Sequence, residues 1–113
     1  ATKIILVVER LLRDKVIAIV EKEGAKGYTV TEGAGKGAHG LHGSDRPGIA
    51  QGFTIVRIEV IVADRETAER IAQQVADRYF KEYPGIVYMD EVEVLEPPEL
   101  KTFLNEKIKN RRF

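Results

Sequence analysis

The spacing of apolar residues divides the first third of the chain into a strand, a helix and a second strand. Residues 3–9 (KIILVVE) are apolar at odd and even positions alike, which is typical of a strand buried on both faces. Between residues 11 and 23 apolar side chains recur at helical spacing, and Gly24 is placed to end this amphipathic helix. Residues 27–32 then predict a second strand.

The second half of the chain repeats this order after a long glycine-rich loop. Residues 53–63 predict the longest strand, with one wholly apolar face and a second apolar face interrupted by Arg57 and Glu59. Asp64 is placed to cap a regular helix over residues 64–80. Residues 86–95 predict a fourth strand, and residues 99–110 a short terminal helix after two prolines.

The order β-α-β, β-α-β predicts an α+β fold of the ferredoxin-like type. In this fold a four-stranded antiparallel sheet carries two helices on one face. The first and third strands are apolar on both faces, so the face without helices would expose a large apolar patch in a monomer. We therefore expect an oligomer in which the sheets cover one another.

Composition limits the classes of function. The 113 residues are expected to form a single domain, 1–113, with a C-terminal extension at about 97–113. Eighteen basic residues balance eighteen acidic ones, which favours neither nucleic acid nor an anionic membrane as a partner. The basic end KIKNRRF is either a solvated tail or a nucleic-acid patch. There is no cysteine and no apparent signal peptide or membrane span, so a cytoplasmic location is expected.

The glycine-rich loop carries the candidate chemistry. Residues 35–40 (GKGAHG) satisfy G-x-G-x-x-G, but no helix follows, and neither a dinucleotide fold nor a P-loop fits the context. Backbone N–H groups beside Lys36 still favour an anion such as phosphate, and the alternative is a flexible hairpin tip. His39 and His42 are candidates for a metal site, for anion or partner contacts, or for solvent exposure, and Arg46 has similar options.

Two further features have alternative explanations. Arg57 and Glu59 form either an ion pair, across strands or between subunits, or the border of a ligand cleft. The Pro-Gly step at Gly85 is either a turn or a source of backbone amides for a ligand. No serine–histidine–acid set and no catalytic carboxylate pair can be argued from spacing, so we expect no enzyme.

Three segments resemble the PII signalling proteins. GAKGYTVTE (residues 24–32) is similar to the second strand and T-loop base of that family, and VRIEVIVAD (56–64) to its third strand. KIILVVE resembles its first strand, and the resemblance covers residues 3–95. It implies a homotrimer of ferredoxin-like subunits with adenine nucleotides in the clefts between subunits. It also implies a T-loop, at about 36–53, that docks on a transporter or enzyme.

The resemblance implies a set of nucleotide-binding positions. These are Val7, Gly27, Tyr28, Thr29, Gly35, Lys36, Gly37, Arg57, Glu59, Ile61, Gly85, Ile86, Val87 and Tyr88. Within the set, Lys36 and Gly37 would lie towards the phosphates, and residues 85–88 would replace the B-loop of the family. His39, His42 and Arg46 would contact phosphate, a co-ligand or the partner protein.

Departures from the family pattern narrow the expected function. The segment around Gly85 lacks the B-loop lysine, and the T-loop lacks both the tyrosine used for uridylylation and the glutamine that helps hold Mg-ATP. These losses indicate the PII-like branch linked to bicarbonate transport and carboxysomes, which senses AMP, ADP, ATP or cyclic AMP, with bicarbonate as a co-ligand. No metal or other cofactor is expected. The alternatives are a CutA-type trimer that binds metal through loop histidines, and a slow nucleotide hydrolase.

Overall fold

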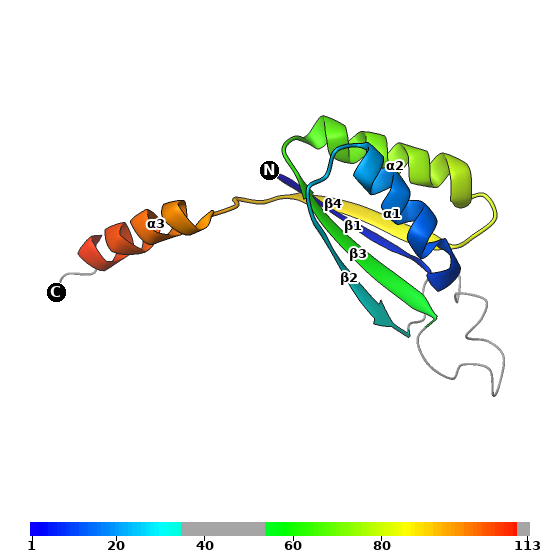
Figure 1. Ribbon diagram of the computed structural model, residues 1–113, viewed down its shortest axis with the longest axis horizontal. Coiled ribbons are helices and arrows are strands. Elements are labelled where there is room, and N and C mark those ends of the chain that lie inside the picture. The colour runs from blue at the N-terminus through cyan, green and yellow to red at the C-terminus, as the bar shows by residue number, and fades with distance from the viewer. Residues whose placement is uncertain (35–53, 111–113) are drawn as a thin grey trace.

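The computed structural model describes residues 1–34 and 54–110, which form one antiparallel sheet, two helices packed on it and a separate terminal helix (Figure 1). The elements are β1 (Thr2–Glu9), η1 (Arg10–Leu12), α1 (Arg13–Lys22), β2 (Tyr28–Gly33), β3 (Ile55–Val62), α2 (Arg65–Tyr79), β4 (Gly85–Glu91) and α3 (Pro97–Asn110). None of the helices in this part of the chain is long and apolar enough to span a membrane.

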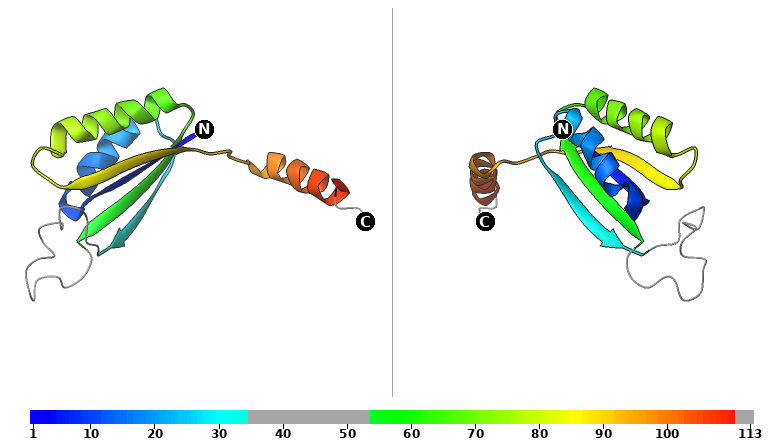
Figure 2. Two further views of the ribbon diagram at one scale, coloured as in Figure 1. Left: turned by 180° about the vertical axis from the view of Figure 1, so that it is seen from behind. Right: turned by 45° about the vertical axis from the view of Figure 1, so that its right-hand side comes forward.

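The strand order β2-β3-β1-β4 is antiparallel throughout and confirms the predicted ferredoxin-like fold. β1 lies between β3 and β4. A strand of the second β-α-β half therefore lies on each side of it. Helices α1 and α2 both lie on the same face of the sheet, and the opposite face carries no helix (Figure 2). We call the second surface the helix-free face.

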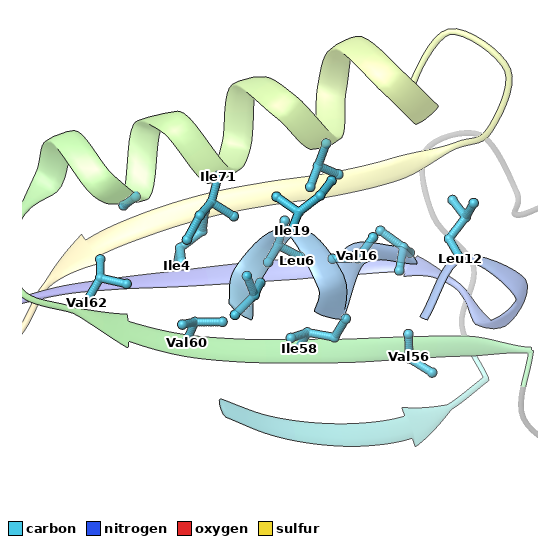
Figure 3. Close-up of a cluster of buried hydrophobic side chains, with 14 residues drawn as sticks. Ile4, Leu6, Leu12, Val16, Ile19, Val56, Ile58, Val60, Val62 and Ile71 are labelled. Carbon is cyan, nitrogen blue, oxygen red and sulfur yellow. The ribbon is translucent and has the colours of Figure 1, made fainter. Parts of the chain in front are cut away.

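The core lies between the sheet and its two helices. Alternate residues of β1 and β3 enter it, because side chains in a strand alternate between the two faces. Their partners from α1 and α2 recur at helical spacing, as the sequence predicts (Figure 3). The buried cluster is Ile4, Leu6, Val8, Leu12, Val16, Ile19, Val20, Val56, Ile58, Val60, Val62, Ala68, Ile71 and Val75.

Helix α1 ends at a glycine for a conformational reason. Gly24 has φ of 87°, a left-handed conformation that other residues adopt at a cost. The Gly24 N–H donates to the carbonyl of Glu21, and the Ala25 N–H donates to the carbonyl of Val20 at 3.3 Å. These two bonds form a Schellman motif, which satisfies carbonyls that the helix leaves free and turns the chain towards β2.

Several boundaries differ from the sequence prediction. The strand predicted over residues 86–95 ends at Glu91, and Val92 beyond it exchanges hydrogen bonds with Ala1. The terminal helix starts earlier than predicted, at Pro97. Proline is tolerated there because the first N–H groups of a helix have no intrahelical acceptor.

The cap of α2 predicts a specific pH dependence of stability. The Thr67 N–H donates to Asp64 Oδ1 at 2.8 Å, and hydrogen bonding from Thr67 holds the pKa of Asp64 below its usual value. The cap contribution is therefore present above the unfolded pKa of about 3.9 and is lost as the pH falls through the folded value. Asn also caps helices well but does not titrate. We expect the melting temperature of Asp64→Asn, followed by circular dichroism, to fall less than that of the wild type on acidification.

A matched control for this experiment is Glu66→Gln, which removes a neighbouring carboxylate without touching the cap bond. It should retain the acid sensitivity of the wild type. Equal acid sensitivity in Asp64→Asn and the wild type would contradict the assignment of this pH dependence to the cap.

Candidate functional site

The helix-free face gathers much of the predicted nucleotide-binding set in two rows. Strand register places Thr29, Glu59, Ile5 and Tyr88 side by side across the sheet. The next row contains Thr31, Arg57, Val7 and Ile86. Ile61 lies one step further along β3 and is 43% exposed. This exposed apolar surface with a few polar groups differs from the dry core beneath it.

Arg57 and Glu59 form an ion pair within one strand, and not across strands. Arg57 Nη2 donates to Glu59 Oε1 at 3.1 Å, and both side chains are half-buried. Tyr88 lies on the far side of β1, close enough to Arg57 to interact with its guanidinium. Ile5, between Glu59 and Tyr88 in the strand register, is fully buried although its face carries no helix.

These contacts keep the side chain of Arg57 positively charged. The hydrogen bond with Tyr88, followed by the bond with Glu59, raises the pKa of Arg57, although partial desolvation opposes the shift. The guanidinium stays protonated at any physiological pH. An arginine held by two partners on a flat surface is a preorganised donor for a polar ligand or for a second chain that covers this face.

The predicted set is divided between the two opposite edges of the sheet. Thr29 lies on edge strand β2, whereas Ile86 and Tyr88 lie on edge strand β4. With neighbouring strands about 4.8 Å apart, three strand spacings separate the two edges by about 14 Å. A single copy therefore carries the β2 and β4 positions of the predicted set on separate edges of its sheet.

Other predicted residues lie elsewhere. Register places Tyr28 opposite Val60 and Val87 opposite Leu6, so both belong to the helix-bearing face. Gly27 precedes β2 and lines a separate cleft. The loop residues of the set, and the loop contacts predicted for histidine and arginine, lie outside the described residues: Gly35, Lys36, Gly37, His39, His42 and Arg46. The nucleotide-binding role of every position in the set stays a prediction.

The structure gives Gly85 a packing role. A Cβ at this position would lie 2.6 Å from Phe80 Cζ and closer still to Cε1 of the same ring. Overpacking of this kind costs about 1–3 kcal/mol when the neighbour cannot move away. Gly85→Ala should therefore destabilise the protein in urea unfolding, and Phe80→Leu should relieve part of the effect.

The control for Gly85→Ala is Gly33→Ala on β2, where a Cβ would meet nothing within 4 Å. That variant should be close to wild type in stability. Equal unfolding midpoints for the two alanine variants would contradict a packing role for Gly85.

A contact at the base of the loop was not predicted from the sequence. The Arg10 N–H donates to the carbonyl of Thr54, and Arg10 Nε lies 3.5 Å from Glu32 Oε1. The residue thus connects the end of β2 with the start of β3, the two segments from which the loop departs. No local sequence signal marks Arg10, since its partners are far away along the chain.

Residues 1–34 and 54–110 line two hollows beside the sheet. The first, which we call the α2/β4 groove, measures about 670 Å³ and is lined mainly by apolar residues of α2 and β4. The second, of about 520 Å³, lies between the end of α1, the end of β3 and the segment that leads to α3. Among residues 1–34 and 54–110, no three histidine or acidic side chains are grouped so as to hold a metal ion.

Comparison with known proteins identifies the family. The family model "Nitrogen regulatory protein P-II" matches residues 1–99, and the chain belongs to this family. A PII-like signalling protein from Thermus thermophilus is 33% identical, with 82% of this chain and 86% of that chain covered and a TM-score of 0.65. The membership predicted from the three sequence segments is confirmed.

More distant solved structures share the fold. CPII from Thiomonas intermedia, bound to ADP and bicarbonate, is 21% identical over 87% of this chain and 91% of that chain, with a TM-score of 0.68. The apo form of CPII is 17% identical over 85% and 92% of the two chains, with a TM-score of 0.65. Both have the architecture described above.

Proposed function

We propose that this protein is a PII-like signal-transduction protein that senses adenine nucleotides, with bicarbonate as a co-ligand. The nucleotide, AMP, ADP, ATP or cyclic AMP, would bind between copies of the chain in a homotrimer. The predicted T-loop, at about 36–53, would then regulate a partner such as a transporter or an enzyme of inorganic-carbon metabolism. Family membership and the ligands of CPII support the nucleotide and bicarbonate classes.

The observation that carries the proposal is the distribution of the predicted set. Positions at β2 and at β4 lie on opposite edges of the sheet, about 14 Å apart by strand spacing. A nucleotide bound where the β2 edge of one copy meets the β4 edge of another would contact both groups at once. A cleft between subunits therefore explains why residues so distant in one chain form a common set.

The helix-free face supports assembly. Ile61, Ile86 and Tyr88 are each more than 40% exposed there, around the fully buried Ile5. Exposed apolar side chains on a sheet face that no helix covers are typical of an interface. The Arg57–Glu59 pair supplies fixed polar contacts within it, so the assembly would be specific in orientation.

The proposed mechanism follows from the thermodynamic linkage between nucleotide binding and the conformation of the loop. A nucleotide bound at the β2 edge would contact the base of the loop, where Arg10 connects Glu32 with Thr54. A ligand shifts a conformational equilibrium only by its difference in affinity for the two states. Nucleotides that differ in phosphate number would thus favour different loop states and different affinities for the partner.

A thermal-shift panel tests the proposal. The melting temperature is measured with ADP, AMP, ATP and cyclic AMP, each with and without bicarbonate. GDP serves as the control for recognition of the adenine base. A ligand present at 100 times its Kd stabilises the folded state by about 2.7 kcal/mol, which raises the melting temperature by several degrees. We expect at least one adenine nucleotide to do so and GDP to do less. No shift with any adenine nucleotide would overturn the proposal.

A further inference from the structure

Helix α3 leaves the body of the protein without packing on it. Figures 1 and 2 show it separated from the sheet and from α1 and α2 in each view, joined only by an extended segment. It forms no substantial contact with any other described helix or strand. Leu104 is 49% exposed. A helix of this length has little stability on its own in water, so it needs a surface to pack against.

The sequence of α3 gives it an amphipathic pattern. Apolar residues stand at positions 100, 103, 104 and 108, the spacing of a single stripe on a helix. With a rise of 1.5 Å per residue, this stripe is about 12 Å long. A helix with one apolar stripe buries that stripe in an apolar groove when one is available.

The α2/β4 groove has matching dimensions and chemistry. Phe80, Val87 and Met89 provide its apolar surface, and the small side chains of Ala72 and Ala76 allow a second helix to approach α2 closely. The lining residues of β4 run from Gly85 to Met89, a length of about 13 Å at 3.3 Å per residue. The groove is therefore as long as the apolar stripe of α3.

Charge also favours contact between α3 and a protein body. Residues 97–113 contain five basic and two acidic side chains, whereas residues 1–96 contain thirteen basic and sixteen acidic ones. The extension thus carries a net charge of +3 and the body a net charge of −3. This complementarity attracts the extension to a body and weakens as salt is added.

The path of the connecting segment selects a second copy as the occupant. Val94 and Glu96 lie in the cleft beside Gly27 and Ile61, at the end of the sheet where β2 and β3 lie. The chain has therefore crossed away from its own β4 edge before α3 begins. To reach its own groove it would have to leave this cleft and reverse direction.

We propose that α3 of one copy docks in the α2/β4 groove of a second copy of this chain. The contact is heterologous, because α3 and the groove are different surfaces, and heterologous contacts close into a ring when the rotation between neighbouring copies closes. A cyclic assembly would then be held together by an exchanged helix as well as by its sheets. This inference does not depend on nucleotide binding.

Disulfide trapping tests it, because the chain has no cysteine of its own. Ala76→Cys in the groove and Leu104→Cys in α3 are placed on separate chains with different affinity tags and are co-expressed. Under mild oxidation we expect a disulfide-linked pair that carries both tags. The matched control replaces Leu104→Cys by Thr102→Cys, about half a turn away from the apolar stripe, and should give several-fold less linked product.

The alternatives have distinct outcomes. If α3 folds back on its own chain, the double variant Ala76→Cys/Leu104→Cys forms an internal disulfide and the mixed chains give no linked pair. If the basic amphipathic helix binds membranes instead, the protein floats with vesicles that contain anionic lipid, and no disulfide forms. Either result, or equal linkage with the Thr102→Cys control, overturns the proposal. Circular dichroism of each variant establishes that it is folded.

Discussion

Two variants that each fail to bind nucleotide should regain part of that binding when they are assembled together. Thr29→Glu places a repulsive carboxylate at the β2 edge, and Ile86→Glu does the same at the β4 edge. Both residues are exposed on the helix-free face, so neither change disturbs the core. If each cleft is formed by the β2 edge of one copy and the β4 edge of the next, each variant alone has a defect in every cleft.

Co-assembly creates intact clefts from defective chains. In a randomly mixed ring, about one quarter of the interfaces would join an unchanged β2 edge to an unchanged β4 edge. Calorimetric titration with ADP should therefore give no binding for either variant and about a quarter of the wild-type stoichiometry for the mixture. Sedimentation first establishes that each variant assembles, because loss of the oligomer would remove binding for another reason.

A cleft formed within one chain makes the opposite prediction. Every chain in the mixture would then carry its own defect, and mixing would restore nothing. A further control is the double variant Thr29→Glu/Ile86→Glu mixed with wild type. In that mixture an intact cleft forms only where two wild-type chains are neighbours. About one quarter of the interfaces meet this condition.

The fold could be predicted largely because its signals are local. A strand that is apolar on both faces, helical spacing after it and Gly24 at the end of α1 are each specified by neighbouring residues, and the structure contains all three. The errors are at ends that depend on distant partners. β4 ends at Glu91, where its pairing with Thr2 of β1 ends, and no pattern within β4 itself reveals this.

The candidate site could be predicted only in part, because its contacts also depend on partners that are distant along the chain. Alternation along β3 placed Arg57 and Glu59 on one face, and register then brought Tyr88 to them from another strand. The proximity of Arg57 and Tyr88 across β1 depends on strand order, which spacing does not encode. Arg10 was missed because its two partners lie on either side of the loop.

Two neighbouring isoleucines of β1 should differ strongly in their effect on stability. Ile4 and Ile5 are both fully buried, but Ile4 lies in the core beneath α2, whereas Ile5 lies on the helix-free face beside the Arg57 side chain. Close-packed cores relax little around a deleted group, so Ile4→Ala should lower the free energy of unfolding by about 2–5 kcal/mol.

Ile5→Ala should cost less than about 2 kcal/mol, because a site that can collapse into the space left behind loses less. The Arg57 side chain is 41% exposed and Tyr88 is 47% exposed, so the surroundings of Ile5 are less closely packed than the core around Ile4. Urea unfolding of the two variants at one fixed chain concentration makes the comparison, since assembly contributes to the stability of an oligomer. Equal losses would mean that the surroundings of Ile5 relax no more than the core around Ile4 does.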